Sequence, residues 1–281
     1  MRILVTGATG RVGRRFVPRL LARAAGSDTV RLLVRDPARA EPLVRLGAEA
    51  MTGELREPAD VRRALAGAEA VVNLAASFPA PGVPDEELWA VNHEAALALA
   101  RAALDAGASR FVQAGTGLVY GAGRGRPAAG DGGPVPGTPA WDAYARSKRA
   151  AEEGLLALHR AYGLDVRIGR LTYVHGEGGP HPAAALHRAA GRPDRRRTAS
   201  IRHADVPQGL LRLLYAPGIG GRAYDLADHA PATAVEPYRL SGAGIPAGPW
   251  DGVVSAVRVG GAPGPRPRYP WARAVGDAGV R

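Results

Sequence analysis

The sequence predicts an α/β protein in which a doubly wound parallel sheet is joined to a smaller C-terminal lobe. Short runs rich in Val, Ile and Leu alternate with helix-like stretches over the first 170 residues. A glycine-rich turn follows the first run, and the alternation weakens beyond residue 175. The chain has 281 residues, 46% of them hydrophobic, so it is long enough to bury a large core.

The alternating elements can be read in order along the chain. The expected strands are 2–6, 29–34, 69–74, 110–115 and 165–170, and the expected helices are 11–24, 57–66, 85–106 and 142–162. Strands separated by helices imply right-handed βαβ units and a parallel sheet that is covered on both faces. A stretch rich in Gly and Pro at 121–140 interrupts the pattern, and a loop of that length is usually a functional lid or a disordered segment.

The C-terminal part predicts fewer elements. Helices near 182–190 and 205–216 and a strand near 222–226 are expected, and the Gly-, Pro- and Arg-rich tail from Ser241 holds one more helix candidate at 270–278. We therefore divide the chain into a domain at 1–175 and a small substrate-binding lobe at 176–281. The two are interleaved, because no linker separates them.

Composition excludes several classes of protein. The net charge is +11, but the basic residues are scattered without interleaved aromatic residues, and 36 of the 37 are Arg, which points to coding bias rather than to nucleic-acid binding. There is no cysteine, and His175, His181 and His203 do not form a recognisable metal-binding set. No apolar run is long enough to cross a membrane, and no signal peptide precedes the first strand, so a cytoplasmic protein that binds neither membrane nor metal is expected.

Residues 6–13 form a phosphate-binding turn of the kind found in Rossmann-type domains. Gly7 permits the tight turn, Gly10 lets the backbone approach a pyrophosphate, and Gly13 lets helix and strand pack closely. The N-terminus of the following helix offers free N–H groups and a partial positive charge. The turn therefore predicts dinucleotide binding by Gly7, Thr9, Gly10, Arg11, Val12 and Gly13.

The residues after the second strand favour NADP over NAD. NAD binders usually carry an acid at the end of this strand, where Val34 stands here. Arg35 follows it, and Arg35 and Arg11 could clamp a 2′-phosphate, since a planar guanidinium suits phosphate. If the register differs by one or two residues, Asp36 becomes the ribose ligand and NAD is the cofactor.

Tyr144 and Lys148 are candidate catalytic residues. Four residues apart on a helix, the phenol and the amine share one face. A tyrosine needs a nearby positive charge to act as a base at neutral pH, and Lys148 can supply it. Lys148 is the single lysine of the chain, although 36 positions use arginine, which indicates that this position requires a lysine.

Together these residues resemble the extended short-chain dehydrogenase/reductases, the NAD(P)-dependent epimerase/dehydratase family. The similarity covers residues 1 to about 230 and includes several further segments in the order that the family has them. These are 53–55, 73–76, 91–92, 111–121, 170–176, 203–206 and 224–226.

The resemblance implies a catalytic set of Thr116, Tyr144 and Lys148. It also implies cofactor contacts from Tyr144 and Lys148 themselves and from Glu54, Leu55, Leu74, Ala75, Ala76, Asn92 and Tyr173. Glu54 stands where the family has an aspartate, Gly115 where it has a second hydroxyl, Leu171 where it has a proline, and Tyr173 where it has an asparagine. Ser77 and Tyr173, together with Thr116, could also contact the substrate.

Three functions stay open at this stage. The first is an NADP-dependent oxidoreductase that acts on a small carbonyl or alcohol, with Tyr144 as the acid or base. The second is a nucleotide-sugar epimerase or dehydratase that retains its NAD, and the third is a non-catalytic cofactor sensor. Only eleven residues separate Gly191 from His203, too few for the loop that clasps a nucleotide diphosphate, which favours the first. The resemblance also predicts a homodimer through the helices at 85–106 and 142–162.

Overall fold

The computed structural model of the chain describes residues 1–24, 28–120, 142–176, 197–228 and 232–233. Contacts divide the chain into two units. The first unit holds 1–115, 139–169 and 210–223, and the second holds 116–138, 170–209 and 224–281. The domain boundary near residue 175 stays a prediction.

The predicted strands and helices that fall on described residues occur in the predicted order, with further short elements between them. The described elements are β1 (Arg2–Thr6), α1 (Gly13–Ala24), β2 (Thr29–Val34), η1 (Ala38–Ala40), α2 (Glu41–Val44), β3 (Glu49–Thr52), α3 (Pro58–Leu65), β4 (Ala70–Asn73), α4 (Asp85–Trp89), a π-helical segment (Ala90–Glu94), α5 (Ala95–Asp105), β5 (Arg110–Thr116), η3 (Gly117–Tyr120), α6 (Asp142–Tyr162), β6 (Asp165–Leu171), β7 (Tyr173–His175), β8 (Arg197–Thr198), β9 (Ser200–Arg202), α8 (Val206–Tyr215), β10 (Arg222–Leu226) and β11 (Ala232–Thr233).

The main sheet has seven strands within the described residues, in the order β10-β6-β5-β4-β1-β2-β3. β1 pairs in parallel with both β2 and β4, and the pairs β2–β3 and β4–β5 are also parallel. The strand order reverses at β1, so the carboxyl end of β1 lies at the topological switch point, where such sheets bind ligands. The prediction of a Rossmann-type doubly wound sheet is confirmed.

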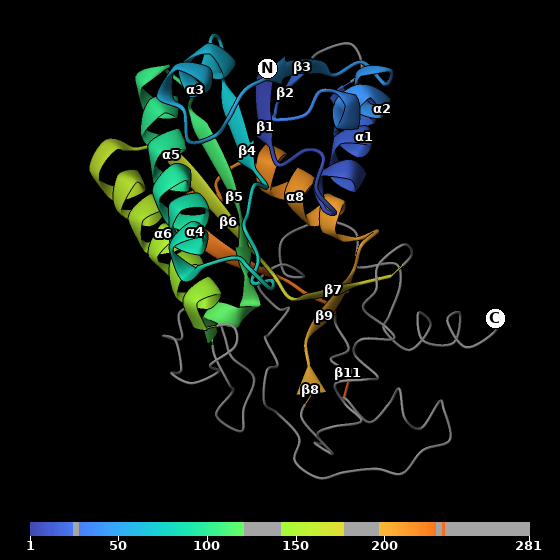
Figure 1. Ribbon diagram of the computed structural model, residues 1–281, viewed down its shortest axis with the longest axis vertical. Coiled ribbons are helices and arrows are strands. Elements are labelled where there is room, and N and C mark those ends of the chain that lie inside the picture. The colour runs from blue at the N-terminus through green and yellow to red at the C-terminus, as the bar shows by residue number, and fades with distance from the viewer. Residues whose placement is uncertain (25–27, 121–141, 177–196, 229–231, 234–281) are drawn as a thin grey trace, which may run out of the picture. The chain divides into compact units, whose positions relative to one another are not determined.

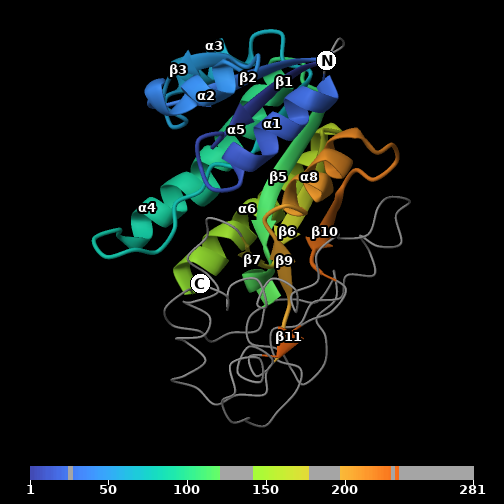
Figure 2. The same cartoon turned by 90° about the vertical axis from the view of Figure 1, so that its right-hand side faces the viewer.

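Helices cover both faces of this sheet in the first unit. Figures 1 and 2 show α3, α5 and α6 side by side over one face and α1 and α2 over the other. The strands carry fully buried aliphatic residues, and α1 turns Phe16, Val17 and Leu20 inward. This is the burial that an amphipathic helix on a sheet requires.

Several parts of the pattern differ from the prediction, and the short strands β7, β8, β9 and β11 of the second unit were not expected. The helix expected at 85–106 is divided by a π-helical segment at Ala90–Glu94. β3 and the short helical turns η1 and α2 were not expected, because β3 is an edge strand with mostly exposed residues and no apolar run. The loop at 121–140 and the helices expected at 182–190 and 270–278 lie outside the described residues.

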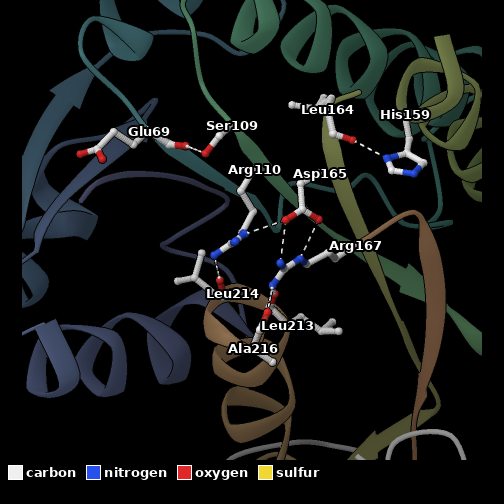
Figure 3. A network of polar contacts seen from close by, with 10 residues as sticks. All are labelled: Glu69, Ser109, Arg110, His159, Leu164, Asp165, Arg167, Leu213, Leu214 and Ala216. Carbon is white, nitrogen blue, oxygen red and sulfur yellow. Dashed lines mark hydrogen bonds and ion pairs between the residues drawn. The ribbon is translucent and has the colours of Figure 1, made fainter. Parts of the chain in front are cut away.

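Two arginines from the sheet hold the C-terminal end of α8 (Figure 3). Arg167, 1% exposed, binds the Asp165 carboxylate through Nε at 2.9 Å and Nη2 at 2.6 Å. Its Nη1 also donates to the carbonyl oxygens of Leu213 at 2.6 Å and Ala216 at 2.7 Å. Arg110 donates to Asp165 at 3.1 Å and to the Leu214 carbonyl at 2.6 Å. The guanidinium groups thus satisfy carbonyl groups that the helix end leaves free and neutralise its negative dipole.

The charge of Asp165 is maintained by the same two arginines. Partial burial by itself would raise the pKa of this carboxyl group. The hydrogen bonds and charge of Arg167, followed by those of Arg110, outweigh this effect and hold the pKa below its usual value. Asp165 is therefore ionised at neutral pH and balances the buried Arg167.

The second unit has a buried polar centre of its own. The Tyr120 hydroxyl lies 2.9 Å from both carboxylate oxygens of Asp225, and it accepts a hydrogen bond from Arg170. In the same unit β7 pairs in parallel with β9, and His175 Nε2 lies 3.5 Å from Asp228 Oδ2. The charged Arg170 and Asp225 side chains are therefore buried as hydrogen-bonded groups, the form in which burial is tolerated. None of the helices in the described ranges has the length and apolar character that a membrane span requires.

Candidate active site

The glycine turn joins β1 to α1 with little room for side chains. Gly7 has φ +65°, and a Cβ there would lie 2.5 Å from the Ala75 nitrogen. A Cβ on Gly13 would collide with the carbonyl oxygens of Gly7 and Ala8. Gly7 is therefore required for the turn and for its contact with the chain after β4, and Gly13 for the close approach of α1.

The outer side of the turn fits a pyrophosphate. Gly10 is exposed, and the nearest heavy atom to a Cβ placed on it is the Gly7 oxygen at 3.2 Å, with nothing else within 4 Å. Across the described residues, no partner is recorded for the backbone N–H groups of Arg11, Val12 and Gly13 at the start of α1. A glycine surface without side chains, next to helix N-terminal N–H groups that are not bonded within the protein, is the arrangement that binds phosphate.

The residues after β2 supply cations rather than a free carboxylate. β2 ends at Val34, which is buried, and Arg35 is exposed. The Asp36 carboxylate accepts the Ala38 N–H at 3.0 Å and so stabilises the turn that follows the strand. Arg39, which the sequence analysis did not single out, donates to the Thr9 carbonyl of the glycine turn at 3.4 Å. Its signal was present in the sequence as a second arginine four residues after Arg35.

The segment after β3 is held by local contacts. The Asp60 carboxylate accepts the Glu54 N–H at 2.9 Å, and the Glu54 carboxylate accepts the Arg56 N–H at 3.3 Å. Leu55 is half-buried and packs against the main core. The Glu54 side chain thus lies partly exposed beside Arg56, where the resemblance predicts a cofactor contact.

Asn92 joins three elements of the first unit. Its side chain is buried in the π-helical segment, where it accepts the Ser77 N–H at 2.9 Å and donates to the Ser77 carbonyl at 2.9 Å. It also donates to Ser147 Oγ of α6 at 3.3 Å. Through these bonds Asn92 holds the chain after β4 against α6. Because π-helical turns often occur at functional sites, this position is consistent with a role in the active site.

The hydrogen bonds between Asn92 and Ser77 fix the segment that carries Phe78, whose ring contacts the candidate tyrosine. The rings of Phe78 and Tyr144 stack with centroids 5.1 Å apart and an interplanar angle of 22°. Phe78 is 56% exposed, whereas Tyr144 is 4% exposed. Phe78 was not singled out from the sequence, because nothing in its local pattern separates it from an ordinary loop residue.

Lys148 lies on α6 one turn after Tyr144, as predicted. It is 4% exposed, and its Nζ donates to the Ala114 carbonyl oxygen at 2.7 Å, at the carboxyl end of β5. Burial lowers the pKa of Lys148 from 10.5 to about 8. Burial also raises the pKa of Tyr144 above its usual value of 10, so the phenol holds its proton firmly in the chain alone.

The pKa of Lys148 predicts a specific dependence of stability on pH. Between about pH 8 and about pH 10 the unfolded chain keeps a proton on Lys148 that the folded chain has lost, so the unfolded state binds more protons. The free energy of unfolding should therefore rise with pH in this window, by an amount on the order of 2 kcal/mol relative to a Lys148→Met variant. Urea unfolding of both proteins across the window measures the difference, and parallel pH profiles would contradict it.

The remaining predicted residues lie partly in the second unit. Leu74, Ala75, Ala76 and Ser77 follow β4 in the first unit as half-buried residues. Thr116 ends β5 in the second unit, where it is buried and its Oγ1 accepts the Leu118 N–H at 3.2 Å. Tyr173, also in the second unit, is half-buried and begins β7.

A curated relative resembles most of the chain. It is the 4-hydroxy-2-methyl-3-oxo-4-farnesyl-3,4-dihydroquinoline-1-oxide ketoreductase of Stigmatella aurantiaca, 29% identical over 238 residues, which cover 82% of this chain and 69% of that protein. A shorter match is to sterol demethylase protein B of Methylococcus capsulatus, 36% identical over 112 residues. That match covers 40% of this chain and only 33% of that protein.

The fold and the family agree with these matches. The dTDP-glucose 4,6-dehydratase of Streptomyces venezuelae, solved with NAD bound, has a TM-score of 0.78 at 24% identity, covering 98% of this chain and 96% of that one. Residues 3–204 match the model of the NAD dependent epimerase/dehydratase family. The resemblance drawn from the sequence motifs is confirmed. The chain belongs to the NAD dependent epimerase/dehydratase family of extended short-chain dehydrogenase/reductases and is an NAD(P)-dependent enzyme.

Proposed function

We propose that this enzyme is an NADP-dependent oxidoreductase that transfers hydride to or from a small carbonyl or alcohol substrate, with Tyr144 as the acid or base. The observation that carries the proposal is the pairing of a buried phenol with the single lysine of the chain on one helix. Lys148 is fixed at the end of β5 by its hydrogen bond to Ala114, and Tyr144 is covered by Phe78.

Each residue has a distinct role in the proposed reaction. Tyr144 gives a proton to the substrate oxygen in reduction and takes it back in oxidation. Lys148 lowers the cost of ionising Tyr144, because a nearby ammonium opposes the effect of burial on the phenol pKa. Thr116 holds the substrate oxygen with its hydroxyl group. When bound, the nicotinamide supplies or accepts the hydride.

Phe78 bears on the kind of substrate. One face of its ring stacks on Tyr144, and the side chain is 56% exposed. The preceding residue, Ser77, is fixed by its hydrogen bond to Asn92. An exposed aromatic ring offers a flat apolar surface on which part of the substrate can pack. The similarity to a ketoreductase supports a carbonyl substrate in the same way.

The experiment that tests this function has two arms. Thermal shift with NADP, NAD, and UDP- and dTDP-sugars identifies ligands that bind the folded chain, because such ligands raise its apparent stability. Oxidation of NADPH with a panel of aromatic and aliphatic ketones then tests turnover. Stabilisation by a nucleotide sugar, without turnover of any ketone, would favour the epimerase or dehydratase alternative.

The preference for NADP rests on Arg11, Arg35 and Arg39 around the glycine turn. Arg35→Ala should weaken NADP binding about tenfold to a hundredfold, because a charge-assisted contact to the 2′-phosphate is lost, and should change NAD binding by less than about threefold. Fluorescence titration with NADPH and NADH measures both affinities. Arg45→Ala is the matched control, since Arg45 is exposed and pairs with Glu41 on α2. Equal losses for the two cofactors would make Asp36 the ribose ligand instead.

We also propose that the enzyme forms a homodimer through α5 and α6. The two helices pack closely where Gly154 meets Leu97, and their outward side chains include the small Ala98 and Ala157. Small exposed side chains let a second pair of helices approach, as in a four-helix bundle. Light scattering should give twice the mass of one chain, and a monomer would remove the proposal.

A further inference from the structure

Three polar side chains form a row across the centre of the main sheet. Thr6 of β1, Asn73 of β4 and Gln113 of β5 are register neighbours and are 1%, 1% and 2% exposed. We call them the polar row. Leu4, Val71 and Phe111 occupy the equivalent positions two residues earlier on the same strands, and all three are fully buried. Since side chains two residues apart share a face, that face is apolar until it reaches the polar row.

The polar row is joined by hydrogen bonds that run in one direction. Thr6 Oγ1 donates to Asn73 Oδ1 at 2.5 Å, and Asn73 Nδ2 donates to Gln113 Oε1 at 2.8 Å. Gln113 Nε2 then donates to the Ala114 carbonyl oxygen at 2.9 Å. Each acceptor therefore orients the next donor, and the row ends on one backbone oxygen.

That oxygen is also the acceptor of Lys148. Lys148 lies on α6, and its Nζ donates to the Ala114 carbonyl oxygen at 2.7 Å. This oxygen therefore accepts two hydrogen bonds, one from Gln113 of β5 and one from Lys148 of α6. A carbonyl oxygen has two lone pairs and can accept both. The orientation of the Ala114 peptide, and with it the place of the ammonium, thus depends on a side chain of the polar row.

An apolar core would not need this arrangement. Buried amides are costly unless they are fully hydrogen-bonded, and aliphatic side chains fill the neighbouring positions without that requirement. The polar row lies at the carboxyl ends of the strands, beside the glycine turn and the candidate lysine. Its place in the fold therefore suits a role in the site better than a role in the core.

We propose that Gln113 is a positioning residue for Lys148, acting through the Ala114 carbonyl that both side chains bind, with Thr6 and Asn73 fixing the orientation of its amide. This inference rests on the proposed function, in which Lys148 assists Tyr144. Gln113 touches neither substrate nor cofactor in this account, and its effect is transmitted by one backbone oxygen.

The single lysine of the chain makes a direct test available. Full-length protein labelled with ¹⁵N-lysine should give one side-chain ammonium signal, and NMR at about pH 6, below the pKa of about 8, measures how fast its protons exchange with water. In Gln113→Leu we expect this exchange to be about tenfold faster, because the Ala114 carbonyl that accepts from the ammonium is no longer held in place by Gln113. An exchange rate within about threefold of the wild-type rate, in a folded variant, would overturn the proposal.

A second variant covers the case in which Gln113→Leu does not fold. The double variant Asn73→Leu and Gln113→Leu replaces both partners of the Asn73–Gln113 hydrogen bond by apolar groups, which is often close to neutral for stability, although the Thr6 hydroxyl and the Ala75 N–H lose Asn73 as their acceptor. If the polar row serves only the fold, this variant keeps the wild-type exchange rate. Faster exchange with an intact fold supports the positioning role.

Gln208→Leu is the matched control. Gln208 is the other glutamine of the chain, and it donates to Asp205 Oδ1 at 3.0 Å in the second unit. The same substitution there should leave the lysine signal unchanged. The readout does not depend on turnover, so a failure of the proposed reaction, seen with Tyr144→Phe, is distinguishable from a failure of this inference.

Discussion

Tyr144→Phe should lower kcat by a factor of about 100 to 10,000, the range that a positioned acid or base contributes. The substitution removes the hydroxyl group and keeps the ring, so the stack on Phe78 and the packing against Leu88 and Ala143 are preserved. The affinity for NADPH should therefore change little. Steady-state turnover of the best ketone from the panel, together with NADPH titration, separates the two effects.

Tyr162→Phe provides the control for this result. Tyr162 is the last residue of the same helix and is 70% exposed, so losing its hydroxyl group should leave turnover and stability unchanged. If Tyr144→Phe retains more than about a tenth of the wild-type kcat, Tyr144 is not the acid or base.

Arg167→Met should lower the free energy of unfolding by about 3 kcal/mol, the lower end of the cost of breaking a buried ion pair from one side, because Arg167 is buried but Asp165 is partly exposed. The substitution leaves the Leu213 and Ala216 carbonyl groups of α8 without their donor and leaves Asp165 with Arg110 alone. Methionine fills similar volume, so the loss reports the polar contacts rather than a cavity. Urea unfolding followed by circular dichroism measures it.

Two further variants define the cause. Arg160→Met replaces an exposed arginine of α6 and should change stability by less than about 0.5 kcal/mol. Arg167→Lys keeps the charge but cannot bind the carboxylate through two nitrogens while also reaching two carbonyls, so it should restore only part of the loss. A loss below about 1 kcal/mol in Arg167→Met would mean that α8 is held by its apolar face instead.

Some residues of the candidate site could be predicted from the sequence, and others could not. The glycine turn and the Tyr144–Lys148 pair are local patterns, and their spacing carries the chemistry directly. Phe78, Arg39 and Gln113 were missed because each acquires its role from a partner that is distant in sequence or outside the pattern considered. Gln113 meets Asn73 forty positions away, and Phe78 meets Tyr144 sixty-six positions away. No local periodicity records such contacts.

The sequence by itself determined the order of the main strands and helices, the doubly wound sheet, the family and the glycine turn of an NAD(P)-dependent enzyme. These follow from periodicity and short motifs, which act within a strand, a helix or a turn. Only the tertiary structure decided that a π-helical segment places Asn92 on Ser77, that Arg167 anchors α8, and that a polar row ends on the carbonyl that binds Lys148. Those features depend on register between strands and on packing between helices. Both are fixed by the burial of the whole core rather than by any one segment.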